Sequence, residues 1–142
     1  MNSIIPIAQR QGLDFLILTD HNTMQARRDG KEGFHGKLLL LVGEEISSEG
    51  HYLAMRIGKE VPKAQRFQPT ADAVAAQGGL GFIAHPFWHK KRWEHWELRG
   101  FIGLEIYNAA HSATEPNANR TALSRCFTRQ PTPNAIHTAV GR

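Results

Sequence analysis

The sequence contains a single cysteine, Cys126, among its 142 residues. One cysteine cannot form a disulfide within the chain, and it leaves no second thiolate for a cysteine-based metal site. Any metal site in this protein must therefore be built from histidine and carboxylate side chains.

Long apolar runs are also absent. No stretch approaches the roughly 18 apolar residues that a membrane-spanning helix needs. The N-terminal residues MNSIIPIAQRQG show neither a basic leader nor a long apolar core, so they do not resemble a secretory signal. We predict no membrane contact and a cytoplasmic location. The length suits one domain with a modest core.

Acidic residues are the minority among the charged ones, with 13 Asp and Glu against 17 Lys and Arg and a net charge of +4. This balance makes association with phosphates and other anions electrostatically easy. The chain is rich in histidine, with eight residues, and several of them directly follow apolar runs. Histidines in such positions are candidates for metal binding or acid–base chemistry.

The first such run is Leu13–Thr23, LDFLILTDHNT. Asp14–Leu18 is apolar on both alternating faces, which is typical of a buried parallel strand. Functional groups collect at the carboxyl ends of such strands, where this chain has Asp20 and His21. Because Asp20 and Asn22 also favour turns, a turn or helix cap is an equally good interpretation of these residues alone.

A second apolar run, KLLLLV, ends in the carboxylates Glu44 and Glu45, and His51–Ile57 follows as another strand. The connection is too short for a parallel crossover, so the two strands should form a hairpin. With the turn centred on Ser48, Glu45 and His51 would face each other, roughly 5 Å apart at the backbone. They could hold one cation, or form a cross-strand ion pair on the surface.

Two helices are predicted by their caps and stops. Ser3 can cap a helix that begins at Ile4 and stops at Gly12, and Thr70 can cap another over Ala71–Gln77. The double glycine after the second helix leads into a further strand.

This strand is Leu80–Ala84, and His85 follows it. A right-handed crossover would place His85 on the same edge of the sheet as His21. The alternative interpretation is a core histidine that is hydrogen-bonded to the backbone.

The segment Phe87–Trp96, FWHKKRWEHW, combines three tryptophans with basic residues. It could form an amphipathic helix or a lid over an anionic substrate. We favour the simpler interpretation, in which Trp93 and Trp96 pack on the fold at helical spacing. Basic and aromatic residues side by side also raise single-stranded nucleic-acid binding as an alternative function.

The last strand expected is Gly103–Tyr107. Residues 1–110 should form the main domain, and residues 111–142 a loosely ordered C-terminal extension with a short helix over 119–127.

The motifs TDHNT, GEEIS with GHYLA, GGLGFIAHPF and GLEIYN occur in the order and approximate spacing of the polymerase and histidinol phosphatase (PHP) superfamily. Over Gln11–Asn108 the chain most resembles the CehA/McbA-like metallohydrolases. The resemblance implies an α/β fold, specifically a partial, distorted (β/α)7 TIM-like barrel. It also implies two or three divalent cations, Mn, Zn or Fe, at the C-terminal rim.

Carried over position by position, the resemblance implies a set of ligands and catalytic groups. His21, His51 and His85 match imidazole ligands, and Glu45 matches the carboxylate that bridges two metals. Asp20 matches a partner of His21 or a further ligand. The implied catalytic residues are Glu45, His85 and Asp20.

Other positions match less well. Glu105 and Asn108 match a pair at a strand end, to which we assign only a supporting role. The family also carries an H-x-H motif on its first strand and a D-x-H motif on its last, and neither occurs in this chain. His111 and His137 have the wrong surroundings to replace them. We therefore expect a truncated chain with an incomplete site and weak or no activity.

The function that the resemblance implies is metal-dependent hydrolysis of a small-molecule phosphoester or other ester, in which a hydroxide that bridges the metals attacks. A non-catalytic metal-binding or scaffold remnant is the alternative. The sequence does not determine the oligomeric state.

Overall fold

The structure is a computed structural model that describes residues 4–63, 66–88 and 90–108. The Ser3 cap, the helix expected over 119–127, the extension over 111–142 and the histidines at 111 and 137 lie outside the described residues. The chain divides into two compact units, Met1–Glu105 and Ile106–Arg142. The first unit contains all the described helices and strands. The expected boundary between residues 110 and 111 stays a prediction.

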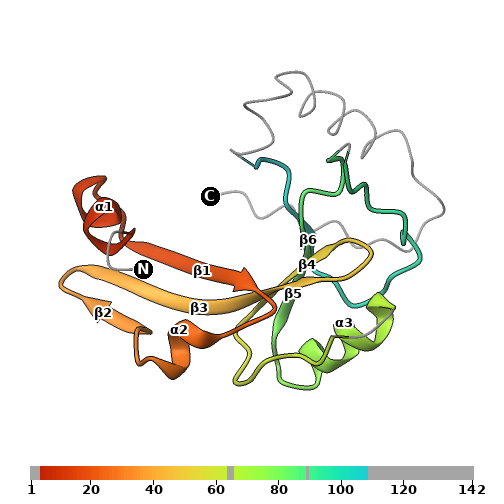
Figure 1. The fold of residues 1–142 in the computed structure, drawn as a ribbon, viewed down its shortest axis with the longest axis horizontal. Coiled ribbons are helices and arrows are strands. Elements are labelled where there is room, and N and C mark those ends of the chain that lie inside the picture. Colours follow the sequence, from red (N-terminus) through yellow and green to blue (C-terminus); the bar gives the residue numbers. More distant parts are fainter. Residues whose placement is uncertain (1–3, 64–65, 89, 109–142) are drawn as a thin grey trace. The chain divides into compact units, whose positions relative to one another are not determined.

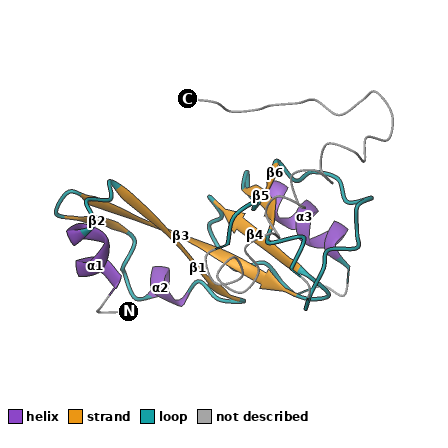
Figure 2. Ribbon diagram, turned by 90° about the horizontal axis from the view of Figure 1, so that it is seen from above, coloured by secondary structure: helices purple, strands orange, loops and turns teal. Residues whose placement is uncertain are grey.

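The first unit is built on one mixed sheet with short helices (Figure 1). The strands are β1 (Phe15–His21), β2 (Gly33–His35), β3 (Leu38–Ser47), β4 (His51–Met55), β5 (Leu80–Ile83) and β6 (Gly103–Leu104), and the helices are α1 (Ile4–Arg10), α2 (Gln25–Arg28) and α3 (Phe67–Ala75). The order is β1-β3-β4-β5-β6, and β2 also pairs with β3. Strands make up most of the regular structure (Figure 2).

Strand direction decides which strand ends meet. β1 pairs parallel to β3, β4 pairs antiparallel to both β3 and β5, and β6 pairs parallel to β5. β1, β3 and β5 therefore run in one direction and β4 in the other. The carboxyl ends of β1, β3 and β5 consequently share one edge of the sheet with the beginning of β4.

β1 forms as predicted and is parallel, but the expectation that it is buried on both faces is wrong. Its residues are half-buried or exposed, and Phe15 is 60% exposed. Among the described residues, β1 pairs only with β3. The apolar residues of β1 therefore lie at a sheet edge, where only part of their surface is covered.

The β3–β4 hairpin is confirmed, but its predicted register is wrong by two residues. His51 pairs with Ser47, and Glu45 pairs with Leu53. The loop is Ser48–Gly50, so its centre is Glu49, one residue after the predicted centre at Ser48. Because side chains alternate between faces with a period of two, Glu45 and His51 still share a face as diagonal neighbours.

α3 begins earlier than its predicted cap. It starts at Phe67, and its N-cap Arg66 makes no side-chain capping hydrogen bond. Phe67 is buried against Trp93, with ring centroids 4.4 Å apart, and Pro69 is tolerated in a first turn. Tertiary packing of Phe67 thus outweighs the capping signal of Thr70, which lies buried inside the helix.

The segment from residue 87 to 96 is not helical where the structure describes it; it consists of turns and irregular backbone. Trp93 is 1% exposed and packs in the core as predicted, whereas Trp96 is 43% exposed. The backbone amides of Trp88 and Lys91 donate to carbonyls three residues earlier, at His85 and Trp88, which are turn bonds. The helical spacing of the two tryptophans therefore does not reflect a helix.

The two faces of the sheet differ in burial. On one face, alternate residues of β3, β4 and β5 pack into the core with α2 and α3; they include Val42, Ile46, Tyr52, Ala54 and Ile83. We call this the core face. The opposite face carries Glu45, Ser47 and His51, all half-buried. No helix in the described part of the chain combines the length and apolarity needed to cross a membrane.

Candidate metal centre

Three imidazoles converge on a single carboxylate oxygen at the shared strand edge. Glu45 Oε1 lies 2.6 Å from His51 Nδ1, 3.4 Å from His85 Nε2 and 3.8 Å from His21 Nδ1. We call these four residues the His–Glu cluster. They are the four residues for which the sequence predicted metal binding.

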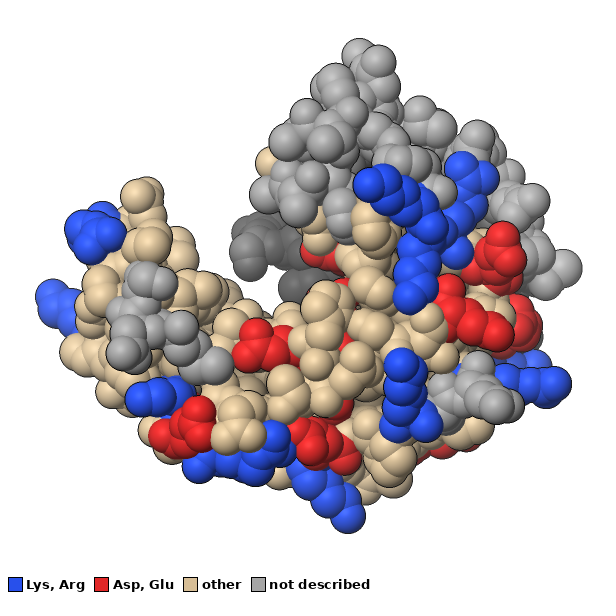
Figure 3. Space-filling view, viewed as in Figure 1, with Lys and Arg blue, Asp and Glu red and all other residues tan. Residues whose placement is uncertain are grey.

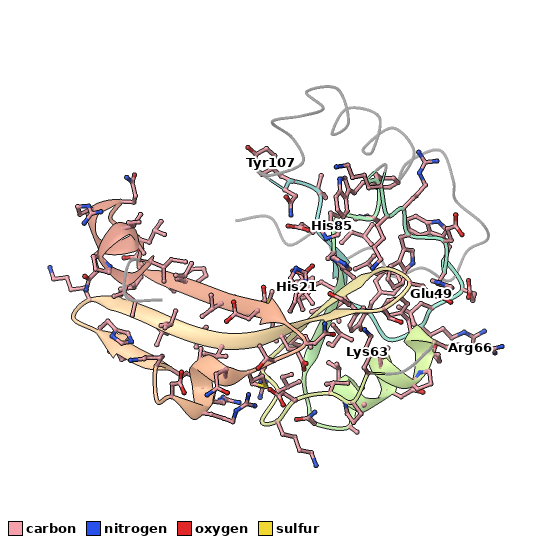
Figure 4. All side chains as sticks on the ribbon, viewed as in Figure 1. His21, Glu49, Lys63, Arg66, His85 and Tyr107 are labelled. Carbon is pink, nitrogen blue, oxygen red and sulfur yellow. The ribbon has the colours of Figure 1, made fainter. Side chains whose placement is uncertain are left out.

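Each member of the cluster comes from a different strand end. His21 ends β1, Glu45 lies near the end of β3, His51 begins β4, and His85 follows β5 by two residues. Figure 4 shows His21 and His85 on the same side of the sheet. The alternation of parallel and antiparallel neighbours brings together residues that are up to 64 positions apart in the sequence.

The imidazoles also contact one another. His51 Nδ1 lies 2.9 Å from His85 Nε2, and the His21 and His51 rings meet edge to face with centroids 5.1 Å apart. Both of these nitrogens also lie close to Glu45 Oε1, so the contacts between the rings and the contacts to the carboxylate occupy the same small space.

The electrostatics of the cluster keep Glu45 ionised. Burial by itself would raise the pKa of Glu45, but hydrogen bonds from His51 and His85 and the nearby charges of His21 and His51 lower it from 4.5 to about 2. A carboxylate whose charged form is stabilised in this way is anionic at neutral pH. The cluster thus offers a cation one negatively charged oxygen and three imidazole nitrogens, which bind a metal in their unprotonated form.

The donor set fits a divalent cation. Ligand atoms of His21, Glu45 and His51 all lie within 4.8 Å of one another, and His85 contacts both Glu45 and His51. Two donors on one tetrahedral ion lie roughly 3.4 Å apart, given bonds of about 2.1 Å. The separations from Glu45 Oε1, 2.6 to 3.8 Å, bracket this value. Nitrogen and carboxylate donors suit Zn, Fe and Mn.

The backbone of His85 is held by the carboxylate of Glu105, the residue that follows β6. The φ of His85, +26°, is unusual for a residue with a side chain, and its backbone N–H donates to Glu105 Oε2 at 2.8 Å. This hydrogen bond matches the supporting role predicted for Glu105. Asn108, predicted as its companion, belongs to the second compact unit, and its role stays a prediction.

The structure does not bring Asp20 into the cluster. Asp20 pairs with Glu44 in the β1–β3 register, one position before the pair His21 and Glu45, so it faces the other side of the sheet. Its predicted catalytic role stays a prediction, but direct contact with the cluster would require a change in β1.

Sequence reasoning did not single out three residues at this site. Ser47 Oγ lies 2.7 Å from His21 Nδ1, and Asn22 Oδ1 accepts a hydrogen bond from Ser47 N at 2.9 Å. The Trp88 ring lies against His85, with centroids 5.4 Å apart. Ser47 and Asn22 both lie at strand ends, which could have marked them as site residues. Serine and asparagine are also common in turns, so the sequence favoured a turn at both positions.

The fold is similar to that of a solved structure from another organism. A protein from Bifidobacterium adolescentis, provisionally described as a metal-dependent phosphoesterase, matches with a TM-score of 0.56 and 14% identity over 85% of this chain and 76% of that one. At this identity the likeness shows a shared mixed α/β fold. A two-domain protein from Bacteroides vulgatus, said to contain a predicted PHP-like metal-dependent phosphoesterase, matches with a TM-score of 0.49 and 18% identity over 86% of this chain and 42% of that one.

Sequence comparison is less informative about function. No family model matches the chain. An uncharacterised protein of Methanocaldococcus jannaschii is 25% identical over 133 residues, which cover 91% of this chain and 77% of that protein. The related protein thus extends over most of the same length but carries no known activity.

Proposed function

We propose that the protein is a metal-dependent hydrolase of the PHP type that acts on phosphoesters. The observation that carries this proposal is the convergence of three imidazole nitrogens on Glu45 Oε1. A surface ion pair needs one histidine, and a core histidine needs a backbone partner. Three histidines around one ionised carboxylate are the arrangement that a divalent cation requires.

In this proposal His21, Glu45, His51 and His85 hold the cation. A bound divalent cation would supply Lewis acidity, which activates water and polarises a phosphoryl or ester oxygen. Glu45 contributes the negative charge, since its pKa lies near 2. Asp20 faces away from the cluster, and its role in this proposal is indirect: it helps to position β1, which carries His21.

The substrate class is a small-molecule phosphoester. The shared fold with the Bifidobacterium protein supports this class, because that protein is provisionally described as a phosphoesterase. We further infer that the sheet is part of an incomplete, distorted barrel of the PHP type and that the protein is similar to the CehA/McbA-like group. The four sequence motifs support that finer assignment.

The two alternatives differ in what the cluster does. A metal-binding scaffold would hold the cation without turnover, and a nucleic-acid module would need a basic surface. On the face shown in Figure 3, the described Lys and Arg side chains are interspersed with Asp and Glu. Arg27 and Arg28 are paired with Glu32 and Glu60, so these arginines are already neutralised within the fold.

The test begins with cation binding by the full chain. We expect isothermal titration with Mn²⁺ or Zn²⁺ to show stoichiometric binding, and hydrolysis of an aryl phosphate to be weak and dependent on the cation, because the site is incomplete. His85→Ala should lose binding. His35→Ala is the matched control, because His35 lies on β2 and its Nε2 bonds to the Lys31 carbonyl at 2.7 Å, away from the cluster.

The outcomes separate the three functions. Cation binding with hydrolysis supports the proposal, and binding without hydrolysis supports the scaffold alternative. Absence of cation binding together with salt-dependent binding to single-stranded nucleic acid supports the basic module. Equal loss of binding in His35→Ala and His85→Ala would point to a general folding defect and would count against the cluster as the site.

A further inference from the structure

His21 is the least supported member of the His–Glu cluster. Its side chain is 59% exposed, whereas those of His51 and His85 are 12% and 7% exposed. It also ends β1, which in the described residues pairs on one side only. Packing alone therefore leaves the His21 ring free to rotate, and a free ring is a poor ligand because binding must first restrict it.

Ser47 supplies a contact that restricts this ring. Ser47 Oγ lies 2.7 Å from His21 Nδ1, a good hydrogen-bond length for a hydroxyl and an imidazole nitrogen. Ser47 is the last residue of β3 and lies on the same face as Glu45, two positions earlier. His21 Nδ1 is also the nitrogen that lies 3.8 Å from Glu45 Oε1, so the hydroxyl fixes the orientation of the ring edge that faces the cluster.

Asn22 in turn holds the end of β1 against β3. Its φ is +52°, a left-handed conformation that Asn adopts more readily than most residues. Its backbone N–H donates to the Glu45 carbonyl at 3.0 Å, and its Oδ1 accepts from the Ser47 N–H at 2.9 Å. The turn after β1 is thus fastened to the backbone that carries both Glu45 and Ser47.

These contacts form a closed arrangement across two strands. His21 bonds to Ser47 through its ring, and the next residue, Asn22, bonds to Ser47 and Glu45 through its side chain and backbone. We call Asn22 and Ser47 the β1–β3 clasp.

We propose that the β1–β3 clasp is a positioning device: Asn22 and Ser47 orient the His21 ring for cation binding without binding the cation themselves. The inference rests on the proposed function, in which His21 is a ligand. Hydrogen-bonding partners of metal-binding histidines fix ring orientation, and their loss costs roughly 10–100-fold in metal affinity.

The main experiment is a double-mutant cycle measured by titration with Co²⁺, whose visible absorption reports its coordination. Ser47→Ala should weaken Co²⁺ binding by roughly 10–100-fold, and Ser47→Thr, which keeps the hydroxyl, should restore it. In a His21→Ala background, Ser47→Ala should have no further effect, because the residue it positions is gone. An equal loss in both backgrounds would show a general structural effect and overturn the proposal.

Asn22 allows a second test that separates its hydrogen bond from its backbone conformation. Asn22→Gly permits the positive φ but removes the side chain, whereas Asn22→Asp keeps an acceptor oxygen. We expect Asn22→Gly to weaken Co²⁺ binding and Asn22→Asp to retain it. If Asn22→Gly bound Co²⁺ as tightly as the parent, the side-chain bond to Ser47 would have no positioning role.

A cation-free measurement keeps this proposal separate from the proposed function. NMR relaxation of the His21 ring should show restricted ring motion in the parent and greater ring motion in Ser47→Ala. If the parent binds no cation but shows this difference, the proposed function fails and the clasp stands. If the His21 ring is as mobile in the parent as in Ser47→Ala, the clasp is contradicted whatever the protein binds.

Discussion

Glu44 and Glu45 are neighbours in β3, yet they experience opposite environments on the two faces of the sheet. Glu44 lies on the core face with 1% of its surface exposed, where Oε2 accepts a hydrogen bond from Val61 N at 2.9 Å. Burial raises the pKa of Glu44, with a further rise from the Glu60 charge, and the Val61 bond opposes both. Glu45 lies among histidines, and its pKa is lowered to about 2.

The comparison shows that burial alone does not make a carboxylate functional. Both residues lose solvent, but the partners of Glu45 outweigh the effect of burial on its pKa, whereas the Val61 hydrogen bond does not outweigh it for Glu44. On the core face, apolar neighbours such as Val42 and Ile46 surround Glu44. The core face therefore contributes to stability, the opposite face carries the proposed binding site, and substitutions on the two faces should have separable effects.

The largest effect on the core face is expected for Trp93. Trp93→Ala should lower the free energy of unfolding by about 3–5 kcal/mol, because a buried aromatic leaves a cavity. Trp96→Ala is the matched control and should cost less than about 1 kcal/mol, since this tryptophan is 43% exposed. Urea unfolding followed by circular dichroism measures both. Similar losses for the two variants would contradict the burial difference.

The largest effect on the opposite face is expected for Glu45. Glu45→Gln should weaken divalent cation binding by more than about 100-fold, which exceeds the usual cost of losing an outer partner of a ligand. Glu44→Gln, one residue away, should change the affinity by no more than a few fold. Isothermal titration of the two variants in parallel checks this difference. A comparable loss in Glu44→Gln would remove the distinction between the faces.

A smaller loss of stability is expected for a substitution at Gly81, where the core face has no room for a side chain. A Cβ added at Gly81 would lie 1.8 Å from the Tyr52 hydroxyl oxygen, so Gly81→Ala should cost about 1–3 kcal/mol of unfolding free energy through overpacking. Tyr52→Ala in the same chain should absorb part of this cost, giving a non-additive double mutant. Thermal unfolding of the single and double mutants measures the coupling, and strictly additive losses would argue against a clash at this point.

The smallest effect concerns the pH dependence of Glu44. Its folded pKa lies above the ordinary value of 4.5, so just above pH 4.5 the native state binds more protons than the unfolded chain. Stability therefore falls as the pH rises through this interval. Glu44→Gln should thus gain stability relative to the parent as the pH rises from 4.5 to 8.

Thermal unfolding of the parent and Glu44→Gln at both pH values checks this sign. All other ionisable groups are the same in both proteins, so their contribution cancels in the difference. A difference that stays constant with pH, or that shrinks towards pH 8, would contradict the direction of the Glu44 shift.

Much of the sheet is readable from local patterns. The apolar runs before His21, Glu45 and His85 predict β1, β3 and β5, because such runs form strands and their polar tips mark the strand ends. The short connection before His51 predicts the hairpin. The candidate ligands follow from these strand ends, and the structure brings all four together, while their role in binding a cation stays a proposal.

Other features depend on contacts that no local pattern encodes. The hairpin register, the early start of α3 and the irregular backbone after His85 are decided by side chains such as Phe67 and Trp93, which pack against residues distant in the sequence. Tertiary packing of this kind routinely overrides capping and helical spacing.

By itself, the sequence determined which residues stand at strand ends and that any metal site must use histidine and carboxylate donors. Only the tertiary structure decided that Glu45 pairs with His21, that β1 lies at a sheet edge, and that Ser47 Oγ lies beside the His21 ring. The physical reason is that strand alternation is a local property, whereas register and pairing depend on the whole sheet.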